Sequence, residues 1–218
     1  MSIVIHGVPG SPYVRAPLAA CEEKGVAWRL AALGAPDTKA PAHLARHPFG
    51  RVPALEHGDF ILYETQAILR YIDQAFDGPA LTPSEPRAQA RMNQAIGVVD
   101  CYVMPSISAS IAFNRVVKPM FGMPPDEDAI AAAMPMARTC IVALEAVLDG
   151  KPFLAGETVT LADLHAGPHF DFLAMAPEGA ELLRGSPLEG WLARLNARPS
   201  FQKTTMAVLR AALTAEPA

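Results

Sequence analysis

The sequence contains few cysteines, and they form no recognisable pattern. Among 218 residues there are three, at widely separated positions: Cys21, Cys101 and Cys140. Their odd number argues against a disulfide framework, and the lack of a C-x-x-C pair argues against a dithiol redox site. We therefore expect all three to be buried small hydrophobic residues.

An excess of charge of one sign is also missing. The chain has 18 Lys and Arg against 22 Asp and Glu, which gives a net charge of −4. Because the two signs are interspersed, the sequence predicts no nucleic-acid-binding face.

Long apolar runs are lacking as well, although 51% of the residues are hydrophobic. No run approaches the ~20 residues that a membrane-spanning helix needs. The start, from Met1 to His6, lacks the basic region and the apolar core of a signal peptide. We expect a soluble, cytoplasmic protein with a globular core and no membrane partner.

The first 33 residues predict a strand, a helix and a second strand. Residues 3–5 form a short apolar run that ends in glycines and a proline. Apolar spacing from Val14 to Cys21 then predicts a helix that ends at Lys24-Gly25. Residues 28–33 predict the second strand, so this is a βαβ unit with a right-handed crossover.

The stretch PFGRVPALEHGDFILYET, residues 48–65, predicts a hairpin that feeds a helix. Pro53 lies at the first residue of a strand, where it removes a donor from the ladder and leaves the local backbone free to serve something other than the sheet. Glu64 and Thr65 lie at the helix start, where unpaired N–H groups and the helix dipole favour an anion. The hairpin and helix complete a β-α-β-β-α order by about Phe76.

A proline-rich polar stretch, DGPALTPSEPRAQ, separates this part from a second one in which helical spacing dominates. We predict a first domain at residues 1–77, a linker at 78–86 and an all-helical domain at 87–218. The first long helix, residues 87–117, contains Pro105 and should kink there.

One helix start in the second part is clearly marked, in GETVTLADL. Thr160 is the expected N-cap, with Asp163 reaching back to its N–H and Val159 packing on Leu164. We interpret this capping box as local stabilisation.

Histidines form two i, i+4 pairs, His43/His47 and His165/His169. This spacing suits a metal bound from one helix face. No carboxylate or cysteine accompanies either pair at ligand spacing, so we predict no metal site and expect His165 to pack beneath the capping box.

Four stretches in order resemble the cytosolic glutathione transferase family: GVPGSP, HLARHPFGRVPALEHGDFILYET, VVKPMFGM and KPFLAGETVTLADLH. They are similar above all to the plant-type phi class and its bacterial relatives, and the resemblance covers nearly the whole chain. It implies an α/β plus all-α fold. A thioredoxin-like domain with a mixed four-stranded sheet would be followed by an all-helical domain that supplies the electrophile site.

The resemblance also implies a set of residues that bind glutathione, the co-substrate. Pro53 would be cis, and Val52 would pair its backbone with the cysteinyl residue of glutathione. Glu64 and Thr65 would take the γ-glutamyl end. Lys39, Thr38 and Arg51 lie where the family holds the glycyl carboxylate; Thr38 and Arg51 depart from the usual His and Gln, and Lys39 and Arg51 are otherwise solvated surface cations.

Ser11 lies where the serine of phi-like members stands, so we expect it to donate a hydrogen bond to the glutathione sulfur. On the residues alone, Ser11 is as well explained as a cap of the helix that follows. Tyr13 is the rival donor. No cysteine stands at this position, which disfavours thiol-transferase or dehalogenase chemistry.

By the same resemblance, apolar residues line a pocket for a hydrophobic electrophile. The predicted members are Pro12, Tyr13, Met104, Ser108, Ile111, Phe113, Val116 and Met120. Residues of these types at helical spacing are also typical of plain core. Phe49 would insert into the helical domain of a second subunit in a homodimer; the alternative is that it covers its own domain.

Glutathione conjugation is the predicted activity. A glutathione-dependent peroxidase or isomerase on the same site is an alternative, although the Ser-Ser-Cys motif of zeta-type isomerases is missing. A non-catalytic binding or interaction module is the alternative from another class. Retention of Ser11, Glu64 and Thr65 together argues against that alternative.

Overall fold

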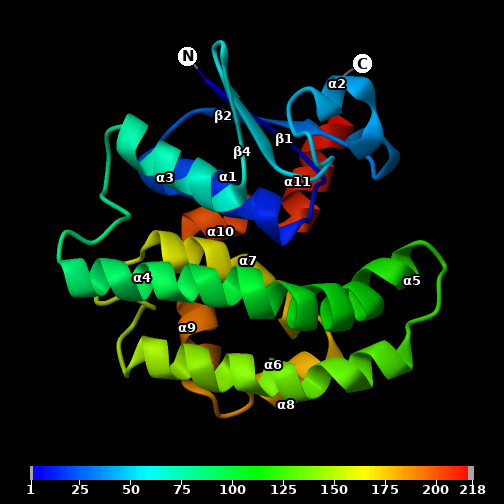
Figure 1. Cartoon of the computed structure of the whole chain (residues 1–218), viewed down its shortest axis with the longest axis vertical. Coiled ribbons are helices and arrows are strands. Elements are labelled where there is room, and N and C mark those ends of the chain that lie inside the picture. Colours follow the sequence, from blue (N-terminus) through cyan, green and yellow to red (C-terminus); the bar gives the residue numbers. More distant parts are fainter. Residues whose placement is uncertain (1, 216–218) are drawn as a thin grey trace. The chain divides into compact units, whose positions relative to one another are not determined.

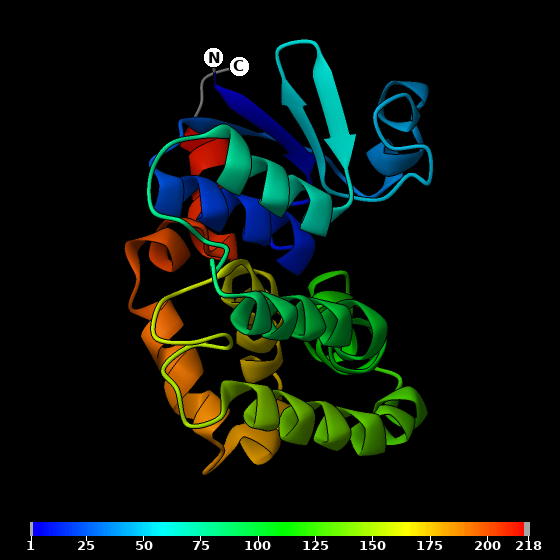
Figure 2. The same cartoon turned by 60° about the vertical axis from the view of Figure 1, so that its left-hand side comes forward.

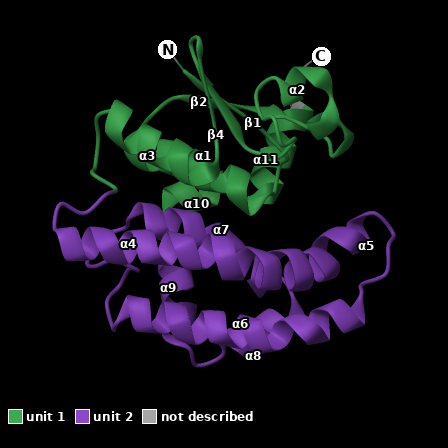
Figure 3. Ribbon diagram, viewed as in Figure 1, with its two compact units in different colours: residues 1–81, 196–218 green, residues 82–195 purple. Residues whose placement is uncertain are grey.

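The structure is a computed structural model that describes residues 2–215 (Figure 1). The chain forms two compact units, one of residues 1–81 with 196–218 and one of residues 82–195 (Figure 3). The predicted boundaries of the domains at 77/78 and 86/87 stay a prediction. The compact units differ from that prediction at the C-terminus, which we expected to belong with the helical domain.

The first unit is built on a four-stranded sheet with the strand order β2-β1-β3-β4. Its strands are β1 (Ile3–Gly7), β2 (Trp28–Ala32), β3 (Ala54–His57) and β4 (Phe60–Tyr63). β1 pairs with β2 in parallel and with β3 antiparallel, and β3 and β4 form the antiparallel hairpin. The predicted mixed sheet is therefore confirmed.

Two helices of this unit lie side by side, α1 (Pro12–Lys24) and α3 (Thr65–Ala75) (Figures 1 and 2). α1 ends as predicted at Gly25, whose φ of 68° allows its N–H to reach the last carbonyls of the helix. The core face of α3 is formed by Ile68, Leu69 and Ile72, which are fully buried. Two shorter helices, η1 (Pro36–Lys39) and α2 (Pro41–Leu44), lie between β2 and β3 in the chain.

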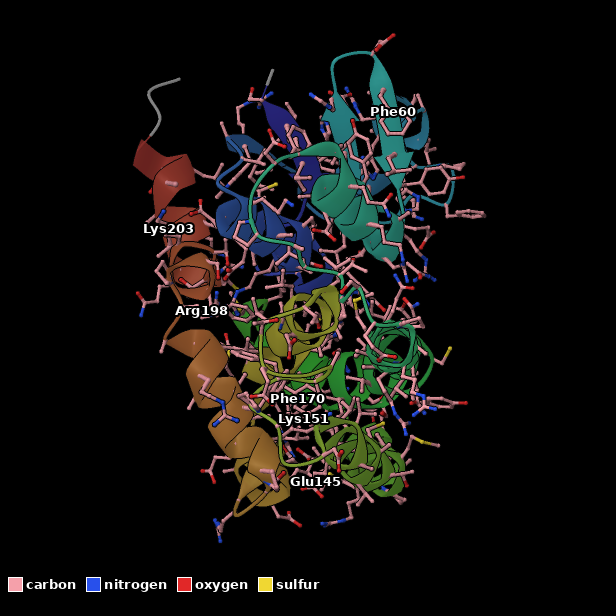
Figure 4. All side chains as sticks on the ribbon, turned by 90° about the vertical axis from the view of Figure 1, so that its left-hand side faces the viewer. Phe60, Glu145, Lys151, Phe170, Arg198 and Lys203 are labelled. Atoms are coloured by element: carbon pink, nitrogen blue, oxygen red, sulfur yellow. The ribbon has the colours of Figure 1, made fainter. Side chains whose placement is uncertain are left out.

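The C-terminal helices α10 (Pro199–Lys203) and α11 (Met206–Ala215) pack with the first unit. Buried Arg15 donates to the carbonyl of Phe201 at 3.0 Å and lies 5.0 Å from the centre of its ring. Glu23 accepts two hydrogen bonds from Arg198 at 2.7 and 2.6 Å. Figure 4 shows Arg198 and Lys203 on this segment. Such polar pairs between distant parts of the chain leave no periodic signal in the sequence, which is why their unit was not foreseen.

The second unit is helical, as predicted. Its elements are α4 (Pro86–Val98), η2 (Val99–Val117), α5 (Lys118–Met120), α6 (Glu127–Leu148), α7 (Leu161–Ala174), α8 (Pro177–Leu183) and α9 (Pro187–Asn196), whose last residue belongs to the first unit. α7 is buried along almost its whole length, and the ring of Phe170 meets that of Trp191 edge-on at 5.5 Å. α7 is therefore the centre of this unit's core.

The long helix changes its hydrogen-bond pattern before it reaches Pro105. η2, which continues α4, is π-helical, and Pro105 lies within it. Since proline cannot donate its backbone hydrogen bond, we expected a disturbance at that residue. The disturbance begins earlier, at Val99, and the predicted kink at Pro105 itself stays a prediction.

Two helical stretches among the described residues are long and apolar enough to cross a membrane, Pro86–Met120 and Glu127–Leu148. We did not expect such stretches from the sequence, because its uninterrupted apolar runs are short. Core helices of soluble proteins pass the same test of length and composition. Within this unit η2 and α6 pack against each other, so their apolar residues have a place in a protein core.

One expectation about the cysteines is wrong. Cys21 and Cys140 are buried, but Cys101 is exposed. Burial raises the pKa of the Cys21 thiol to about 12, so this side chain remains an uncharged hydrophobic group at neutral pH. Cys101 lies on η2, and the apolar spacing of its neighbours did not reveal its exposure.

The predicted capping box is present at the start of α7. Oδ2 of Asp163 accepts from the N–H of Thr160 at 2.8 Å and from its hydroxyl at 2.9 Å. Oδ1 accepts from the N–H of Leu154 and from the indole N–H of Trp191, both at 2.8 Å. The fully buried carboxylate therefore joins the helix start to a loop and to α9, which is more than a local cap.

The cap predicts a graded loss of stability. Replacing Thr160 by Ala should lower the free energy of unfolding by ~1 kcal/mol. Asp163→Asn should cost about 3 kcal/mol or more, because an amide N–H₂ would face donors and leave at least two of them unpaired. Urea unfolding of the variants measures both values, and an Asp163→Asn variant as stable as Thr160→Ala would contradict this account.

Arg115 joins three helices of the second unit. Its guanidinium donates to Glu178 at 2.9 and 2.6 Å and to Glu127 at 2.6 and 2.7 Å. These bonds run from η2 to the starts of α8 and α6, and the hydrogen bonds from Arg115 lower the pKa of Glu178. Because the folded-state pKa of Glu178 is lowered, its contribution to stability is present above the unfolded value and is lost as the pH falls through the folded value.

Arg115→Met should therefore destabilise the protein at neutral pH, by about 1–3 kcal/mol. The difference from the wild type should shrink as the pH falls below about 4.3, the ordinary glutamate value, because Glu178 then loses its charge. Arg138→Met is the matched control, since its pair with Glu181 is more than half exposed on both sides and should contribute less than about 1 kcal/mol. A difference between Arg115→Met and the wild type that does not change with pH would contradict the prediction.

Candidate functional site

Ser11 stands at the N-cap of α1, directly after the loop that follows β1. Its backbone carbonyl accepts from the N–H groups of Val14 and Arg15, but its side chain makes no capping hydrogen bond. The alternative in which the hydroxyl of Ser11 serves only as a cap is therefore not what the structure shows. The hydroxyl remains available beside the unpaired N–H groups of a helix start.

Gly10 precedes Ser11 and is required by its surroundings. Its φ is +95°, and a Cβ atom there would lie 2.5 Å from the sulfur of Met206, on α11. Any other side chain would collide with this thioether and strain the backbone. α11 thus packs directly on the turn that presents Ser11.

Thr65 links the starts of α1 and α3. Its hydroxyl donates to the carbonyl of Tyr13 at 3.4 Å, and only 6% of the residue is exposed. Glu64 precedes it, exposed, with a φ of 72° that non-glycine residues seldom adopt. The structure therefore brings Tyr13, Glu64 and Thr65 together at adjacent helix starts.

The bond between Val52 and Pro53 is cis, as predicted. Pro53 is buried, and β3 begins at the next residue, Ala54. Within residues 2–215, neither the N–H nor the C=O of Val52 has a hydrogen-bond partner. This stretch of backbone is thus free to pair with an extended ligand.

Three residues predicted to hold a carboxylate lie on the segment between β2 and β3. The hydroxyl of Thr38 donates to the carbonyl of Ala35 at 2.9 Å, so it serves the local turn. The ammonium of Lys39 lies 3.3 Å from two carbonyls, of Phe49 and of Gly50. The exposed guanidinium of Arg51 has no ion-pair partner among the residues that the structure describes.

The residues predicted to line an electrophile pocket differ in their surroundings. In the first unit, Pro12 and Tyr13 are half-buried at the start of α1. In the second unit, Ile111 is fully buried and the hydroxyl of Ser108 lies 2.7 Å from Nδ1 of His169, which is the behaviour of core residues. The half-buried or exposed members are Met104, Phe113, Val116 and Met120.

Both histidine pairs are buried, and the rings of His43, His165 and His169 each make a hydrogen bond, whereas the ring of His47 packs on that of Tyr63. Nε2 of His165 lies 2.8 Å from a carboxylate oxygen of Asp100, a partner on η2 that the sequence did not suggest. Burial lowers the pKa of His169 to about 3, which keeps its ring neutral. Nε2 of His43 lies 2.7 Å from the carbonyl oxygen of Arg51. No cluster of three or more metal-ligating side chains occurs within residues 2–215.

The helical unit carries a groove of about 480 Å³ between η2 and α6. It is lined by Cys101, Tyr102, Pro105, Ser106, Ser110, Ala129, Ala132, Ala133 and Met136. The groove exists because the side chains that α6 contributes are mostly alanines, and Pro105 of η2 lines the opposite wall. We did not predict this groove from the sequence, although the run of alanines in α6 is a signal that small residues face a neighbour.

Phe49 belongs to the first unit and is 65% exposed. Its ring lies 6.2 Å from that of His47 and 6.3 Å from that of Tyr63. The alternative, in which Phe49 covers the core of its own domain, does not agree with this exposure.

Comparison with protein-family models matches both parts of the chain. Residues 5–80 match the N-terminal domain of glutathione S-transferases, and residues 94–199 match the C-terminal domain. A glutathione S-transferase of Hyoscyamus muticus is 32% identical over 208 residues, which cover 93% of this chain and 97% of that protein.

Solved structures of related proteins agree with the fold. The theta-class enzyme of Xanthomonas axonopodis pv. citri, with glutathione bound, is 29% identical with a TM-score of 0.81; the match covers 95% of this chain and 99% of that one. Maize glutathione S-transferase I, in complex with an atrazine glutathione conjugate, is 27% identical with a TM-score of 0.83; the match covers 96% and 99%. The chain therefore belongs to the family of soluble glutathione S-transferase enzymes.

Proposed function

We propose that this chain conjugates the thiolate of glutathione to hydrophobic electrophiles, with Ser11 as the hydrogen-bond donor to the sulfur. The observation that carries the proposal is the hydroxyl of Ser11, which the helix start does not use. The thiolate sulfur forms a bond to an electrophilic carbon. The leaving group departs with its electron pair, or, in an addition, the adjacent atom takes up a proton.

The donor is needed because a thiol is a poor nucleophile near neutral pH. Lowering the pKa of the glutathione thiol by two to three units requires ~3–4 kcal/mol of thiolate stabilisation, at about 1.4 kcal/mol per unit. A hydroxyl donor and the N-terminus of α1 together are sufficient sources. Ser11 donates to the sulfur and does not itself become a nucleophile.

The rest of glutathione is assigned to the same unit. The cysteinyl residue pairs with the unpartnered backbone of Val52, and the γ-glutamyl end lies at the start of α3 with Glu64 and Thr65. The glycyl carboxylate is held by Lys39 and Arg51, because both are exposed cations on one segment. Thr38 contributes less, since its hydroxyl is already used.

The electrophile is apolar in this proposal. Phe113 and Met120 are 41% and 45% exposed, although both are large hydrophobic side chains. Exposed apolar groups of this size favour contact with a hydrophobic ligand. The maize relative with its bound atrazine conjugate gives one example of such an electrophile in the family. We assign the activity to the cytoplasm.

A thiol titration of bound glutathione tests the role of Ser11. In Ser11→Ala the pKa of the bound thiol should rise by about 1–2 units, since a hydrogen bond to a charged group contributes about 1.5–3 kcal/mol. The rate of conjugation near neutral pH should then fall about 10- to 100-fold and recover as the pH rises, because the thiolate fraction recovers. The ultraviolet absorbance of the thiolate, followed across pH, measures the pKa directly.

Tyr13→Phe is the matched control for this titration. It removes the rival hydroxyl and should leave the pKa of the bound thiol lowered. A pKa that returns to the solution value in Tyr13→Phe and not in Ser11→Ala would assign the donor to Tyr13. A wild-type protein that binds no glutathione would favour the interaction-module alternative.

We further propose a two-fold homodimer in which Phe49 of each subunit fills the groove between η2 and α6 of its partner. An exposed aromatic side chain and an apolar groove on the same chain are complementary, and a two-fold axis uses both of them twice. The groove offers small side chains and Tyr102, which suit an aromatic ring.

Phe49→Ala should weaken this dimer. With two anchors at ~2 kcal/mol each, its dissociation constant should rise about 10³-fold. Ala132→Phe, which fills the groove from the other side, should have a similar effect, whereas Phe60→Ala removes another exposed phenylalanine and should have none. Sedimentation velocity over a range of concentrations measures the dissociation constants. A dimer that neither Phe49→Ala nor Ala132→Phe weakens would refute the arrangement.

A further inference from the structure

A buried histidine holds the peptide group just before the cis bond, and the proposed function gives it no task. His43 lies on α2 and is 2% exposed. Its Nε2 atom lies 2.7 Å from the carbonyl oxygen of Arg51. Because a carbonyl oxygen can only accept, Nε2 must carry the hydrogen and donate it.

The segment that carries His43 is itself well fixed. The N–H of His43 donates to the carbonyl of Ala40 at 3.0 Å, and its carbonyl accepts from the N–H of His47 at 2.8 Å. The carbonyl of His47 in turn accepts from the N–H of Gly50 at 2.8 Å. The imidazole of His43 therefore has a defined position from which to reach the chain ahead of Val52.

The carbonyl of Arg51, which accepts from His43, belongs to the same peptide group as the N–H of Val52, which is unpaired within residues 2–215. The C=O of Arg51 and the N–H of Val52 lie in one plane and, in a trans peptide, point to opposite sides. A hydrogen bond that fixes the carbonyl oxygen consequently fixes the direction of the Val52 N–H. Donation to the carbonyl also polarises the peptide group and strengthens its N–H as a donor.

We propose that His43 is a positioning residue for glutathione, because its hydrogen bond to Arg51 aims the N–H of Val52 at the cysteinyl carbonyl of the bound peptide. This rests on the proposed function, in which Val52 pairs with glutathione. His43 touches neither the sulfur nor the electrophile. It acts on affinity for the peptide backbone and not on the reactivity of the thiolate.

Two variants separate the hydrogen bond from the volume of the ring. His43→Leu keeps an apolar group of similar size and removes the donor. His43→Gln keeps a donor, because its amide nitrogen lies about as far along the side chain as Nε2. His47→Gln is the matched control, since His47 is also 2% exposed, lies on the same segment and contacts Tyr63 through its ring.

In His43→Leu, the dissociation constant and the KM for glutathione should rise about 10-fold, while kcat at saturating glutathione stays within about twofold. His43→Gln should recover most of the affinity, and His47→Gln should bind within about twofold of the wild type. Calorimetric titration with glutathione gives the dissociation constants, and circular dichroism confirms that each variant is folded. If His43→Leu merely damaged the structure, kcat or the folded fraction would fall, whereas a positioning role raises KM and leaves kcat unchanged.

A nuclear magnetic resonance measurement on the wild type tests the inference even if His43→Leu fails to fold. Because both hydrogen bonds share one peptide group, glutathione should shift the Val52 amide proton downfield and move the nitrogen resonance of His43 Nε2. Unchanged affinity in a folded His43→Leu, or a His43 resonance that does not respond in the glutathione-bound wild type, would overturn the inference and leave the proposed function standing. A wild type that shows no binding of glutathione would overturn the proposed function itself.

Discussion

The hydrogen bond from Thr65 to the carbonyl of Tyr13 joins the starts of the two helices on which the proposed site depends. α1 and α3 pack side by side, and this bond connects the first turn of one to the first turn of the other. Each first turn has N–H groups that the helix itself cannot satisfy. The site that we propose is therefore made from backbone groups that the fold leaves unpaired, and two side chains complete it: Ser11 at one helix start and Glu64 at the other.

The segment before β3 also supplies unpaired backbone groups, although it is not a helix start. Proline ends the hydrogen-bonding ladder there, so the backbone of Val52 has no partner within residues 2–215. This segment is held from outside the sheet. The ammonium of Lys39 donates to the carbonyl of Phe49, and the imidazole of His43 donates to the carbonyl of Arg51. In the proposed site a peptide ligand meets groups that are already held in place, which lowers the entropy lost on binding.

Local patterns predicted the parts of this molecule that depend on local physics. The strand and helix order of the first 76 residues and the capping box at Thr160 each follow from short stretches of sequence, whereas the cis bond at Pro53 was expected from the family resemblance. The resemblance indicated Ser11 as the expected donor to the glutathione sulfur, but the residues alone explained its hydroxyl equally well as a helix cap. The structure shows the hydroxyl outside the cap.

Long-range contacts were not predictable in the same way. The packing of α10 and α11 on the first unit depends on Arg15 and Glu23, whose partners lie at the other end of the chain. The groove between η2 and α6 depends on how two helices face each other, and His43 on the path of a loop. Apart from the alanines of α6, these features leave no period or motif in the sequence, and the exposure of Cys101 was missed for the same reason.

The most direct test of the account is a crystal structure of this chain with glutathione bound. The account predicts the sulfur within hydrogen-bond distance of the Ser11 hydroxyl, about 3.5 Å or less, with the cysteinyl carbonyl on the N–H of Val52. A sulfur held by the hydroxyl of Tyr13, or a glutathione molecule that leaves Ser11 and Val52 untouched, would contradict it.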